Sequence, residues 1–523
     1  METSALPQQA SEQPPERRIA APVAALIGVL SVAIALAVGH LVAGLVGPSA
    51  SPFLAVGNTA IDLTPIQLKD FAVRTFGTYD KLVLLGGMGL VLLGAAVVAG
   101  LLSRRNPLPG SVLAGALGLL GVAAVLARPD SGQLSVLAPI ASLVAGIAVF
   151  RWLHRLALAN RGETSVDSRR TFLRAAGATA VGAGLAGLLG QFLGTRTDVE
   201  GSRAAVGALT PAKPAPAIPA GADFVRDGTP SFLTPNHDFY RVDTALSVPR
   251  VRAETWQLRI HGMVDRELTL SYDDLRGRRL VERTITMTCV SNEVGGPYVS
   301  TANFVGVPLR DVLMEAGVKP GADQLFGTSA DGWTAGSPVE VVMQEDRGAL
   351  LALGMNGEPL PVEHGFPVRM VVPGLYGYIS ATKWLVDLEL TTFAAKQSYW
   401  IDRDWGRLGP IKTMSRIDSP KGLSKVSGGG KTVVSGVAWA QPTGIAKVEV
   451  RADNGPWQEA LLAADVDNSA WRMWRIEFDL PSGGHTVECR ATDKSGFVQP
   501  QARVAPIPDG ATGWHSAFFT VEK

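Results

Sequence analysis

The sequence has very little cysteine and almost no net charge. Cys289 and Cys489 are the only cysteines in 523 residues, so the chain cannot hold the disulfide framework of a small secreted domain. One bridge between these two cysteines is compatible with the sequence, which does not decide it. The formal net charge of +1 gives no electrostatic footprint for DNA or RNA, and we expect no nucleic-acid partner. The length suggests about three domains.

Histidine is also scarce, with seven in the whole chain. His40 lies within the first long apolar run, and His154 lies at the end of the fourth. A transmembrane b-type haem usually needs two histidines at one depth, whereas these two are expected near opposite faces of a bilayer. We therefore predict no bis-histidine haem, and interpret both residues as polar members of a helix bundle or its interface.

Long apolar runs are concentrated in the first 194 residues, where acidic residues are sparse. Five of them approach the roughly 20 residues that cross a bilayer as a helix, and they cover 20–46, 82–102, 111–127, 134–150 and 172–194. The third and fourth are short, so re-entrant or interfacial segments are an alternative for them. We predict a transmembrane α-helical bundle of about five helices over residues 20–194, after a cytoplasmic tail at 1–19.

Basic residues set the expected orientation of this bundle. Arg17 and Arg18 precede the first run, Arg104 and Arg105 follow the second, and a cluster of arginines lies between the fourth and fifth. Because positive charge is retained on the cytoplasmic side, the N-terminus is predicted inside and everything after residue 194 outside. The sequence thus predicts a multi-pass protein of the cell membrane, in contact with membrane lipid, whose C-terminal part is extracytoplasmic.

The fifth apolar run has a distinctive entrance. "SRRTFLRAAG" (168–177) places Arg169 and Arg170 before a run of small apolar residues. This pattern resembles a twin-arginine export signal, here internal in the chain. The alternative is that the arginine pair only marks the cytoplasmic end of a helix. We find no convincing cleavage site after Gly194, and expect the helix to remain as an anchor.

The remainder of the chain divides by composition. Residues 195–222 contain "ALTPAKPAPAIPAGA", which predicts an extended linker. Residues 223–412 mix alternating strand patterns with helical ones and predict an α+β domain. The clearest helical pattern is "VPLRDVLMEAG" (307–317), which ends at a glycine. Residues 413–523 carry only short alternating runs at sandwich spacing, which predicts an immunoglobulin-like β-sandwich.

The thiol of Cys289 stands in a setting that suggests chemistry. "TITMTCVSNEVGG" (284–296) is a strand pattern followed by a polar, glycine-flanked loop. A thiolate is a soft donor that suits a high-valent metal, and a loop after a strand leaves such a metal open to substrate. Taken alone, a buried inert thiol is the commoner interpretation of such a residue. We keep that interpretation for Cys489, which lies within a sandwich strand pattern.

Several motifs in order resemble the sulfite oxidase family of molybdopterin enzymes, over roughly residues 223–523. They are "TCVSN", "FVGVPLRDVL", "DGWTAG", "MNGEPLPVEHGFPVRMVVPGLYGYISATKWL" and "GPIKTMSRIDSP". The resemblance does not extend to the membrane region. It implies a molybdopterin-binding catalytic domain over 223–412, a molybdenum-molybdopterin cofactor, and a dimerisation-type domain over 413–523 through which a homodimer would form.

The resemblance also implies roles for individual residues. Cys289 matches the family's protein ligand to molybdenum, Arg241 of "FYRVD" an arginine near the metal, and Trp405 of "DRDW" the position of a substrate-side tyrosine. These three are the expected catalytic residues. The expected cofactor-binding residues are Arg241, Asn292, His364, Arg369 and Lys383. Their cations and hydrogen-bond donors suit a phosphate-bearing, polar pterin.

Other positions depart from the family pattern. Glu293 and Val294 stand where two arginines follow the Cys-x-x-Asn motif in the animal and plant enzymes, and Val242 and Asp243 replace an Asn-His pair. Fewer cations weaken the match to a dianionic substrate such as sulfite.

The sequence therefore predicts a membrane-anchored oxidoreductase that transfers an oxygen atom and two electrons on a small extracytoplasmic substrate. Quinone or a redox protein is the expected electron partner. The alternative is a non-enzymatic surface binding protein that retains the fold.

Overall fold

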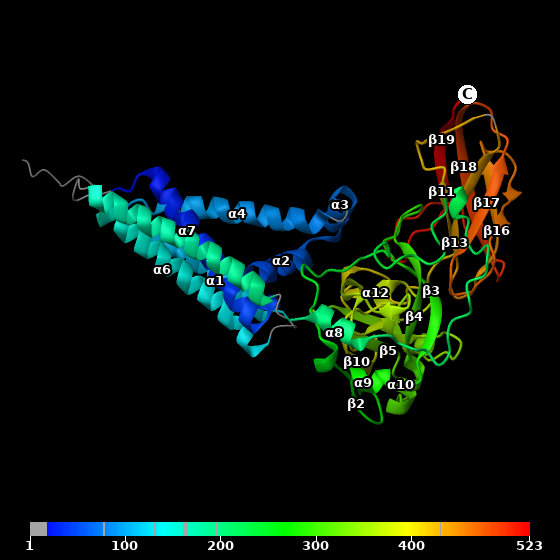
Figure 1. The fold of residues 1–523 in the computed structure, drawn as a ribbon, viewed down its shortest axis with the longest axis horizontal. Coiled ribbons are helices and arrows are strands. Elements are labelled where there is room, and N and C mark those ends of the chain that lie inside the picture. The colour runs from blue at the N-terminus through cyan, green and yellow to red at the C-terminus, as the bar shows by residue number, and fades with distance from the viewer. Residues whose placement is uncertain (1–17, 77–78, 129–131, 160–165, 195–196, 429) are drawn as a thin grey trace, which may run out of the picture. The chain divides into compact units, whose positions relative to one another are not determined.

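The computed structural model of the chain describes residues 18–76, 79–128, 132–159, 166–194, 197–428 and 430–523. The chain forms two compact units, Met1–Arg196 and Thr197–Lys523. Each unit has its own cluster of buried apolar residues, and Figure 1 shows the helices of the first unit and the strands of the second.

The described part of the first unit is helical. Its helices are α1 (Ala21–Val46), α2 (Pro52–Leu63), α3 (Ile66–Phe76), α4 (Asp80–Leu102), α5 (Leu108–Leu126), α6 (Leu137–Ala159) and α7 (Val166–Gly194), with short 3-10 turns at Pro48–Ala50 and Gln133–Val136. Among the described residues, five helices are long and apolar enough to cross a membrane, and each of the five predicted apolar runs overlaps one of them. The short helices α2 and α3 were not predicted.

Helix α1 packs against α4, α6 and α7. At two of these crossings the backbones touch, because glycine leaves no side chain between them. A Cβ on Gly28 of α1 would lie 1.9 Å from the carbonyl oxygen of Ala96, and one on Gly100 of α4 would lie 2.0 Å from that of Ala24. On the α7 side, a Cβ on Gly44 would lie 2.6 Å from the carbonyl oxygen of Gly190. Small residues thus permit the close helix packing typical of membrane bundles.

His154 is buried at this bundle's interior, where its Nε2 lies 2.6 Å from the carbonyl oxygen of Ser103. This agrees with the interpretation of that histidine as a polar residue of the bundle.

The second unit begins with a two-sheet α+β part. One sheet has the order β2-β1-β10-β5-β6, in which only the β1–β10 pair is parallel. Its strands are β1 (Gln257–Gly262), β2 (Leu268–Ser271), β5 (Gln324–Ser329), β6 (Thr334–Pro338) and β10 (Leu385–Thr391). The other sheet is antiparallel, in the order β3-β4-β7-β8 with β9 beside β7. Its strands are β3 (Val281–Thr288), β4 (Val299–Pro308), β7 (Leu350–Met355), β8 (Glu358–Pro359) and β9 (Arg369–Val371).

Short helices connect and flank these strands: α8 (Val199–Val206), α9 (Tyr272–Arg276), α10 (Leu309–Ala316), α11 (Val339–Val342) and α12 (Gly377–Ser380). Further 3-10 turns lie at Val225–Asp227, Ala253–Thr255, Val362–His364 and Ile401–Arg403. Helix α10 is the predicted one: it buries Leu309, Val312, Leu313 and Ala316 and ends at Gly317, whose φ is +73°. A positive φ suits glycine, which has no Cβ to clash.

Helix α8 lies within residues 195–222, which were predicted to be an extended linker. Asp198 caps it by accepting a hydrogen bond from the Gly201 amide at 2.7 Å. The Ser202 hydroxyl donates to Glu254 at 2.8 Å and accepts from the Ala253 amide at 3.0 Å, which docks the helix on the following domain. The rest of the segment is extended, and Lys213 forms an isolated bridge with Val281 of β3.

The C-terminal part is a sandwich of two sheets around one apolar core. The sheets have the orders β11-β13-β17-β16 and β12-β19-β18-β14-β15. Their strands are β11 (Met414–Ser419), β12 (Lys425–Val426), β13 (Thr432–Trp439), β14 (Ile445–Ala452), β15 (Gln458–Glu459), β16 (Leu461–Leu462), β17 (Arg472–Phe478), β18 (Gly483–Asp493) and β19 (His515–Val521). Val434, Trp474 and Phe519 are fully or almost fully buried in this shared core. A sandwich is what the sequence predicts, and its immunoglobulin-like type stays a prediction.

The sandwich supports β3 directly. The Thr286 amide donates to the Ser469 carbonyl at 2.9 Å, and the Thr286 carbonyl accepts from Gln441 Nε2 at 3.0 Å. The Thr286 hydroxyl accepts from the Trp471 amide at 2.7 Å. Strand β3 is therefore held between β4 on one edge and sandwich loops on the other, and this fixes the point at which the strand ends.

Candidate functional site

Cys289 follows directly on the last paired residue of β3. The β3–β4 ladder closes with Thr288 opposite Val299, and the Cys289 amide then donates to the Tyr298 carbonyl at 3.0 Å. The thiol is partly exposed and lies 3.0 Å from the Ser291 hydroxyl. Burial raises the pKa of the Cys289 thiol, and its hydrogen bond with Ser291 opposes this. The second thiol, Cys489, is buried in the sandwich core, and both cysteines are free, so the bridge left open by the sequence is not formed.

Asn292 fixes the loop that carries the thiol. The side-chain oxygen of Asn292 accepts from the backbone amide of Tyr298 at 2.8 Å. The backbone amide of Asn292 donates to the Cys289 carbonyl at 3.1 Å. The side chain is buried. In this structure, Asn292 therefore links the two ends of the 289–298 loop and holds Cys289 at the start of that loop.

Two tyrosines near the thiol were missed by the sequence interpretation. A Cβ on Gly377 would lie 3.7 Å from the Tyr240 hydroxyl oxygen and 4.0 Å from the Thr288 carbonyl oxygen, so the Tyr240 phenol lies near the end of β3. Burial raises the pKa of Tyr240, as does nearby Cys289, while nearby Arg369 lowers it. Burial also raises the pKa of Tyr376 to about 12, with Cys289 adding to the effect. Both phenols are therefore neutral hydrogen-bonding groups at physiological pH.

His364 and Arg369 meet beside Phe239 and Phe304. Arg369 is buried at the start of β9 and donates to the His364 carbonyl at 3.1 Å, with its guanidinium 5.8 Å from the Phe304 ring centre. The imidazole of His364 meets Phe239 edge to face at 5.5 Å. Burial lowers the pKa of His364 to about 4 and that of Arg369 to about 10, so the histidine is neutral and the arginine still charged at pH 7.

Arg241 and Lys383 share one carboxylate. Arg241 Nε and Lys383 Nζ each lie 2.8 Å from the same oxygen of Asp243, whose side chain is 5% exposed. Lys383 also donates to the Glu363 carbonyl at 3.2 Å. Burial lowers the pKa of Lys383 to about 8, and Asp243 opposes that shift. Asp243 is thus part of the site, although the sequence marked it only as a departure from the family pattern.

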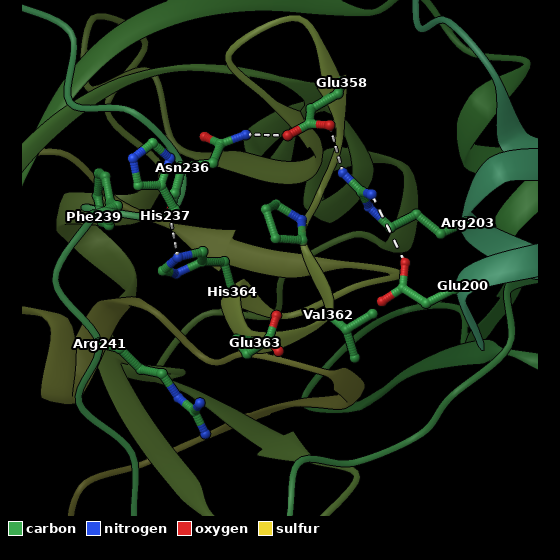
Figure 2. A pocket seen from close by; sticks show the side chains of 11 residues that line it. Glu200, Arg203, Asn236, His237, Phe239, Arg241, Glu358, Val362, Glu363 and His364 are labelled. Atoms are coloured by element: carbon green, nitrogen blue, oxygen red, sulfur yellow. Dashed lines mark hydrogen bonds and ion pairs between the residues drawn. The ribbon is translucent and has the colours of Figure 1, made fainter. Parts of the chain in front are cut away.

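A cleft of about 540 Å³ lies beside this group (Figure 2). His364, Arg241 and Phe239 line it together with Asn236 and residues of helix α8. Cys289, Asn292, Arg369 and Lys383 do not line this cleft. The structure therefore connects Arg369 and His364 by a hydrogen bond, and Arg241 and Lys383 through Asp243, with the cleft on the His364 and Arg241 side.

Trp405 lies in an aromatic cluster. Its ring centre is 5.9 Å from that of Tyr378 and 6.1 Å from that of Trp400. The ring is buried, and within the described residues its indole nitrogen has no hydrogen-bond partner. Its role beside the substrate stays a prediction.

The residues present suit a pterin cofactor that carries a phosphate. The buried Nε of Arg369 and the buried hydroxyl of Thr288 have no partner in the described part of the chain. Buried polar groups are nearly always satisfied, so these two unpaired groups fit a ligand that completes their hydrogen bonds. Arg241 and Lys383 add two cations, and Cys289 adds one thiol. This donor set fits an anionic, metal-bearing group held mainly through its organic part.

Comparison with known proteins gives the family. The profile described as "Oxidoreductase molybdopterin binding domain" matches residues 245–400, which include Cys289, His364, Arg369 and Lys383. Sulfite oxidase of Gallus gallus is 31% identical over 336 residues, which are 54% of this chain and 72% of that protein. The chain belongs to the sulfite oxidase family.

Mitochondrial sulfite oxidase of Macaca fascicularis is 32% identical over 327 residues, or 53% of this chain and 59% of the relative. The chain thus spans only about three fifths of that relative's length. The sulfane dehydrogenase SoxCD of Paracoccus pantotrophus shares the fold, with a TM-score of 0.50 and 23% identity over 59% of this chain and 89% of that one. As a member of this family, the protein is a molybdenum cofactor-dependent oxidoreductase, and its cofactor is molybdenum-molybdopterin.

Proposed function

We propose that the protein is a membrane-anchored enzyme that transfers an oxygen atom, together with two electrons, to or from a small extracytoplasmic substrate. The single observation that carries this proposal is the position of Cys289. Within the part matched by the molybdopterin-binding profile, it is the one cysteine, and it stands at the end of β3 next to buried tyrosines. When bound, the cofactor supplies the two-electron redox chemistry, and the protein supplies ligand, orientation and field.

In this proposal the chain's own groups divide the work. Cys289 gives a thiolate to molybdenum, which requires loss of the thiol proton. Arg369, Lys383 and Arg241 bind the anionic cofactor through charge-assisted hydrogen bonds. Neutral His364 presents an imidazole to the cleft. Tyr240 and Tyr376 keep their protons near the metal position and orient a polar substrate by hydrogen bonds.

The charges around the site favour a substrate with little negative charge. Arg241 and Lys383 are both compensated by Asp243, and Glu293 and Val294 stand where the animal and plant enzymes carry arginines. Of the three cations proposed to bind the cofactor, Arg369 alone has no carboxylate partner among the described residues, so a dianion would find little uncompensated positive charge in this set. An uncharged N-oxide offered with a reduced dye should therefore turn over at a higher kcat/KM than sulfite offered with an oxidised dye. The reverse order would contradict this assignment of substrate class.

The membrane assignment is also part of the proposal. Five apolar helices of sufficient length support anchoring in the cell membrane, and the arginine distribution supports a catalytic unit on the extracytoplasmic side. Quinone or a redox protein would then exchange electrons with the enzyme. The C-terminal sandwich is the expected surface for a homodimer. Membership of the sulfite oxidase family disfavours the alternative of a non-enzymatic surface protein.

The decisive experiment measures metal and turnover together. The full chain, purified in detergent, should contain about one molybdenum per chain, because one cofactor fits one catalytic domain. Cys289→Ser replaces a soft thiolate with a hard, poorly acidic hydroxyl, so turnover should fall more than about a hundredfold, beyond the effect of outer-shell groups. Pterin content should persist.

Cys489→Ser is the matched control, since that thiol is buried in the sandwich, and it should keep normal turnover. Full activity of Cys289→Ser would remove the ligand assignment. Wild-type protein without molybdenum would restore the non-enzymatic alternative.

A further inference from the structure

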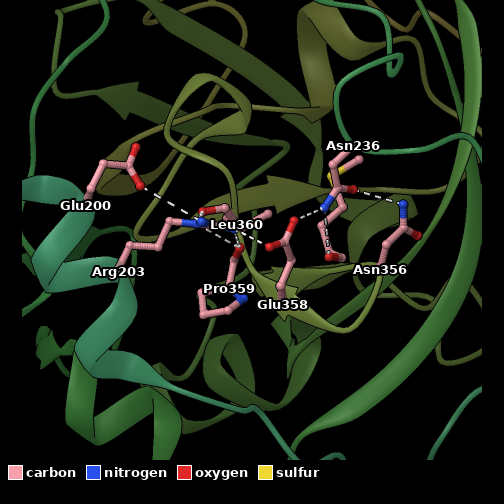
Figure 3. Close-up of polar contacts among 8 residues, drawn as sticks. Glu200, Arg203, Asn236, Asn356, Glu358, Pro359 and Leu360 are labelled. Carbon is pink, nitrogen blue, oxygen red and sulfur yellow. Dashed lines mark hydrogen bonds and ion pairs between the residues drawn. The ribbon is translucent and has the colours of Figure 1, made fainter.

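The side chains of Asn356 and Asn236 form a row of amides beside the cleft, and the donors and acceptors of this row are fixed in order (Figure 3). The Asn303 amide donates to Asn356 Oδ1 at 3.0 Å, so the other end of that side chain must be its Nδ2. Asn356 Nδ2 donates to the Thr234 carbonyl and to Asn236 Oδ1, each at 2.9 Å. A backbone N–H can only donate, and it therefore sets the orientation of both asparagines.

The same logic specifies a carboxylate at position 358. With its oxygen facing Asn356, Asn236 must present Nδ2 toward Glu358, and it donates to Oε1 of that residue. From the other side, Arg203 of α8 lies 2.8 Å from Glu358 Oε2. Glu358 therefore has donors on both sides, and a carboxylate accepts from both, whereas a glutamine could accept from only one.

Arg203 ties this row to the first helix of the second unit. Its guanidinium also donates to the Leu360 carbonyl at 2.9 Å. It donates twice to the Pro359 carbonyl, and the shorter of these two contacts is 2.9 Å. Its side chain is only 20% exposed. Glu358, which lines the cleft, thus contacts Arg203 of helix α8 on one side and Asn236 on the other (Figure 3).

The far end of the row is His364. Its Nε2 lies 3.0 Å from the backbone carbonyl oxygen of Asn236. A carbonyl oxygen can only accept, so the imidazole proton is on Nε2. Nδ1 is then the acceptor of a neutral imidazole, and the ring lines the cleft (Figure 2). A neutral state agrees with the low pKa that burial gives this histidine, about 4.

We propose that Asn236, held by Asn356 and Glu358, is a positioning residue that sets the tautomer and orientation of His364 toward the pterin cofactor. This inference rests on the proposed function, in which His364 contacts the cofactor. It assigns a role in cofactor retention to residues outside the motifs that carry the family resemblance, Asn236 and Arg203, and to Glu358 within one of them.

The test uses a variant of unchanged size. Asn236→Asp places a carboxylate against Glu358. Two adjacent carboxylates raise the pKa of one of them, so a shared proton replaces the lost hydrogen bond at low pH and repulsion replaces it at high pH. Molybdenum per chain, measured after dialysis of the detergent-purified full chain, should match wild type near pH 5 and fall severalfold by about pH 8. Wild type should show no such fall.

A reciprocal exchange provides the rescue. In the double variant Asn236→Asp with Glu358→Gln, the glutamine amide donates to the new carboxylate at position 236, and the glutamine oxygen accepts from Arg203. Each bond to position 358 is restored, with donor and acceptor reversed toward position 236, and the pH dependence should disappear. Arg259→Ala is the control, because it removes an exposed arginine–glutamate pair of similar length, 2.9 Å, on strand β1, and it should retain molybdenum at every pH.

The outcomes separate this inference from the proposed function. His364→Ala should lose molybdenum, and retention there would overturn the cofactor contact and the inference with it. Loss in His364→Ala, with pH-independent retention in Asn236→Asp, would overturn only the positioning role. A fall in Asn236→Asp that Glu358→Gln does not rescue would also contradict the reciprocal bond. Melting temperatures within a few degrees of wild type would show that the variants are folded.

Discussion

At the scale of single residues, the site combines groups that are close in sequence with groups that only the fold brings together. Cys289 and Asn292 belong to one loop. His364 ends a 3-10 turn, and Arg369 begins strand β9 five residues later. Asp243 reaches Lys383 across 140 positions of sequence. Such a pair offers no spacing to detect, which explains why the carboxylate that joins Arg241 to Lys383 was not predicted.

Arg369 gives a direct test of cofactor binding. Its charge-assisted hydrogen bonds to an anionic group are worth on the order of 1.5–3 kcal/mol, or roughly 10–150-fold in affinity. Arg369→Ala should therefore purify with depleted pterin and molybdenum. Arg310→Ala, which removes a partly buried arginine that donates to the Met343 carbonyl at 3.0 Å, is the control and should keep both. Normal cofactor content in Arg369→Ala would refute the placement.

The sequence motifs predicted some of the site residues and missed others. They predicted Cys289, His364 and Arg369, and the structure joins the latter two by a hydrogen bond. They did not predict Tyr240, although it is adjacent to Arg241 in "FYRVD". A buried tyrosine is a common core residue, and only its place at the end of β3 distinguishes it. Trp405, in contrast, was predicted at the site from its place in "DRDW", and its role there remains untested.

At the scale of elements, predictions succeeded where a pattern was long or periodic. The α10 helix and the apolar helices of the first unit have clear periodicity or length. Helix α8 has eight residues, too few to be stable alone, and depends on its Asp198 cap and on contacts with Glu254 and Glu358. Its neighbours are rich in alanine and proline, which favoured an extended interpretation of the whole segment.

Helix α4 provides a prediction about the bundle. Gly100→Val would insert a side chain where a Cβ already lies 2.0 Å from the Ala24 carbonyl, so α1 and α4 must separate. Overpacking of this kind costs about 1–3 kcal/mol or more. The melting midpoint of the helical signal in detergent should fall. Gly94→Val, on the same helix with nothing within 4 Å of its Cβ, should leave it unchanged, and equal effects would contradict the crossing.

Strand β18 provides a prediction about pH. His485 faces acceptors on both ring nitrogens, Asp453 Oδ2 at 2.7 Å and the Pro481 carbonyl at 2.7 Å, so it is best satisfied as the cation. Its pKa is raised, chiefly by the hydrogen bond with Asp453. A raised pKa adds stability that is complete below the unfolded value near 6.5 and is lost as pH rises through the folded value.

His485→Gln should therefore lower the melting temperature more at pH 5.5 than at pH 9. Asp453 is half exposed, and solvent screening limits the effect to about 1 kcal/mol or less. His237→Gln, at a largely exposed histidine beside Asp238, should change little at either pH. A larger effect of His485→Gln at pH 9 would reverse the sign and refute the assignment.

At the scale of the whole molecule, the arginine pair at the start of α7 allows a test of the proposed topology. Arg169 and Arg170 lie in α7, and both side chains are exposed. If they act as a twin-arginine address, replacing both with lysine should leave the preceding helices inserted and retain the catalytic unit in the cytoplasm. The positive-inside rule alone predicts no effect, because the charge is unchanged.

Protease added to spheroplasts distinguishes these two explanations. It should degrade the catalytic unit of the wild type and spare that of the double lysine variant. Equal degradation in both would leave the membrane topology in place and remove the export signal.

The amide row beside the cleft contains an asparagine, Asn356, that is prone to deamidation. Asn356 has a φ of +51° and is followed by Gly357, and an asparagine before glycine loses ammonia more readily than most because no side chain shields the attacking nitrogen. Loss of that ammonia would turn the donor at position 356 into a carboxylate oxygen facing the oxygens of Thr234 and Asn236. A protein that ages in this way would gain about one mass unit. It would lose the hydrogen bond from position 356 to Asn236 without any change elsewhere in the chain.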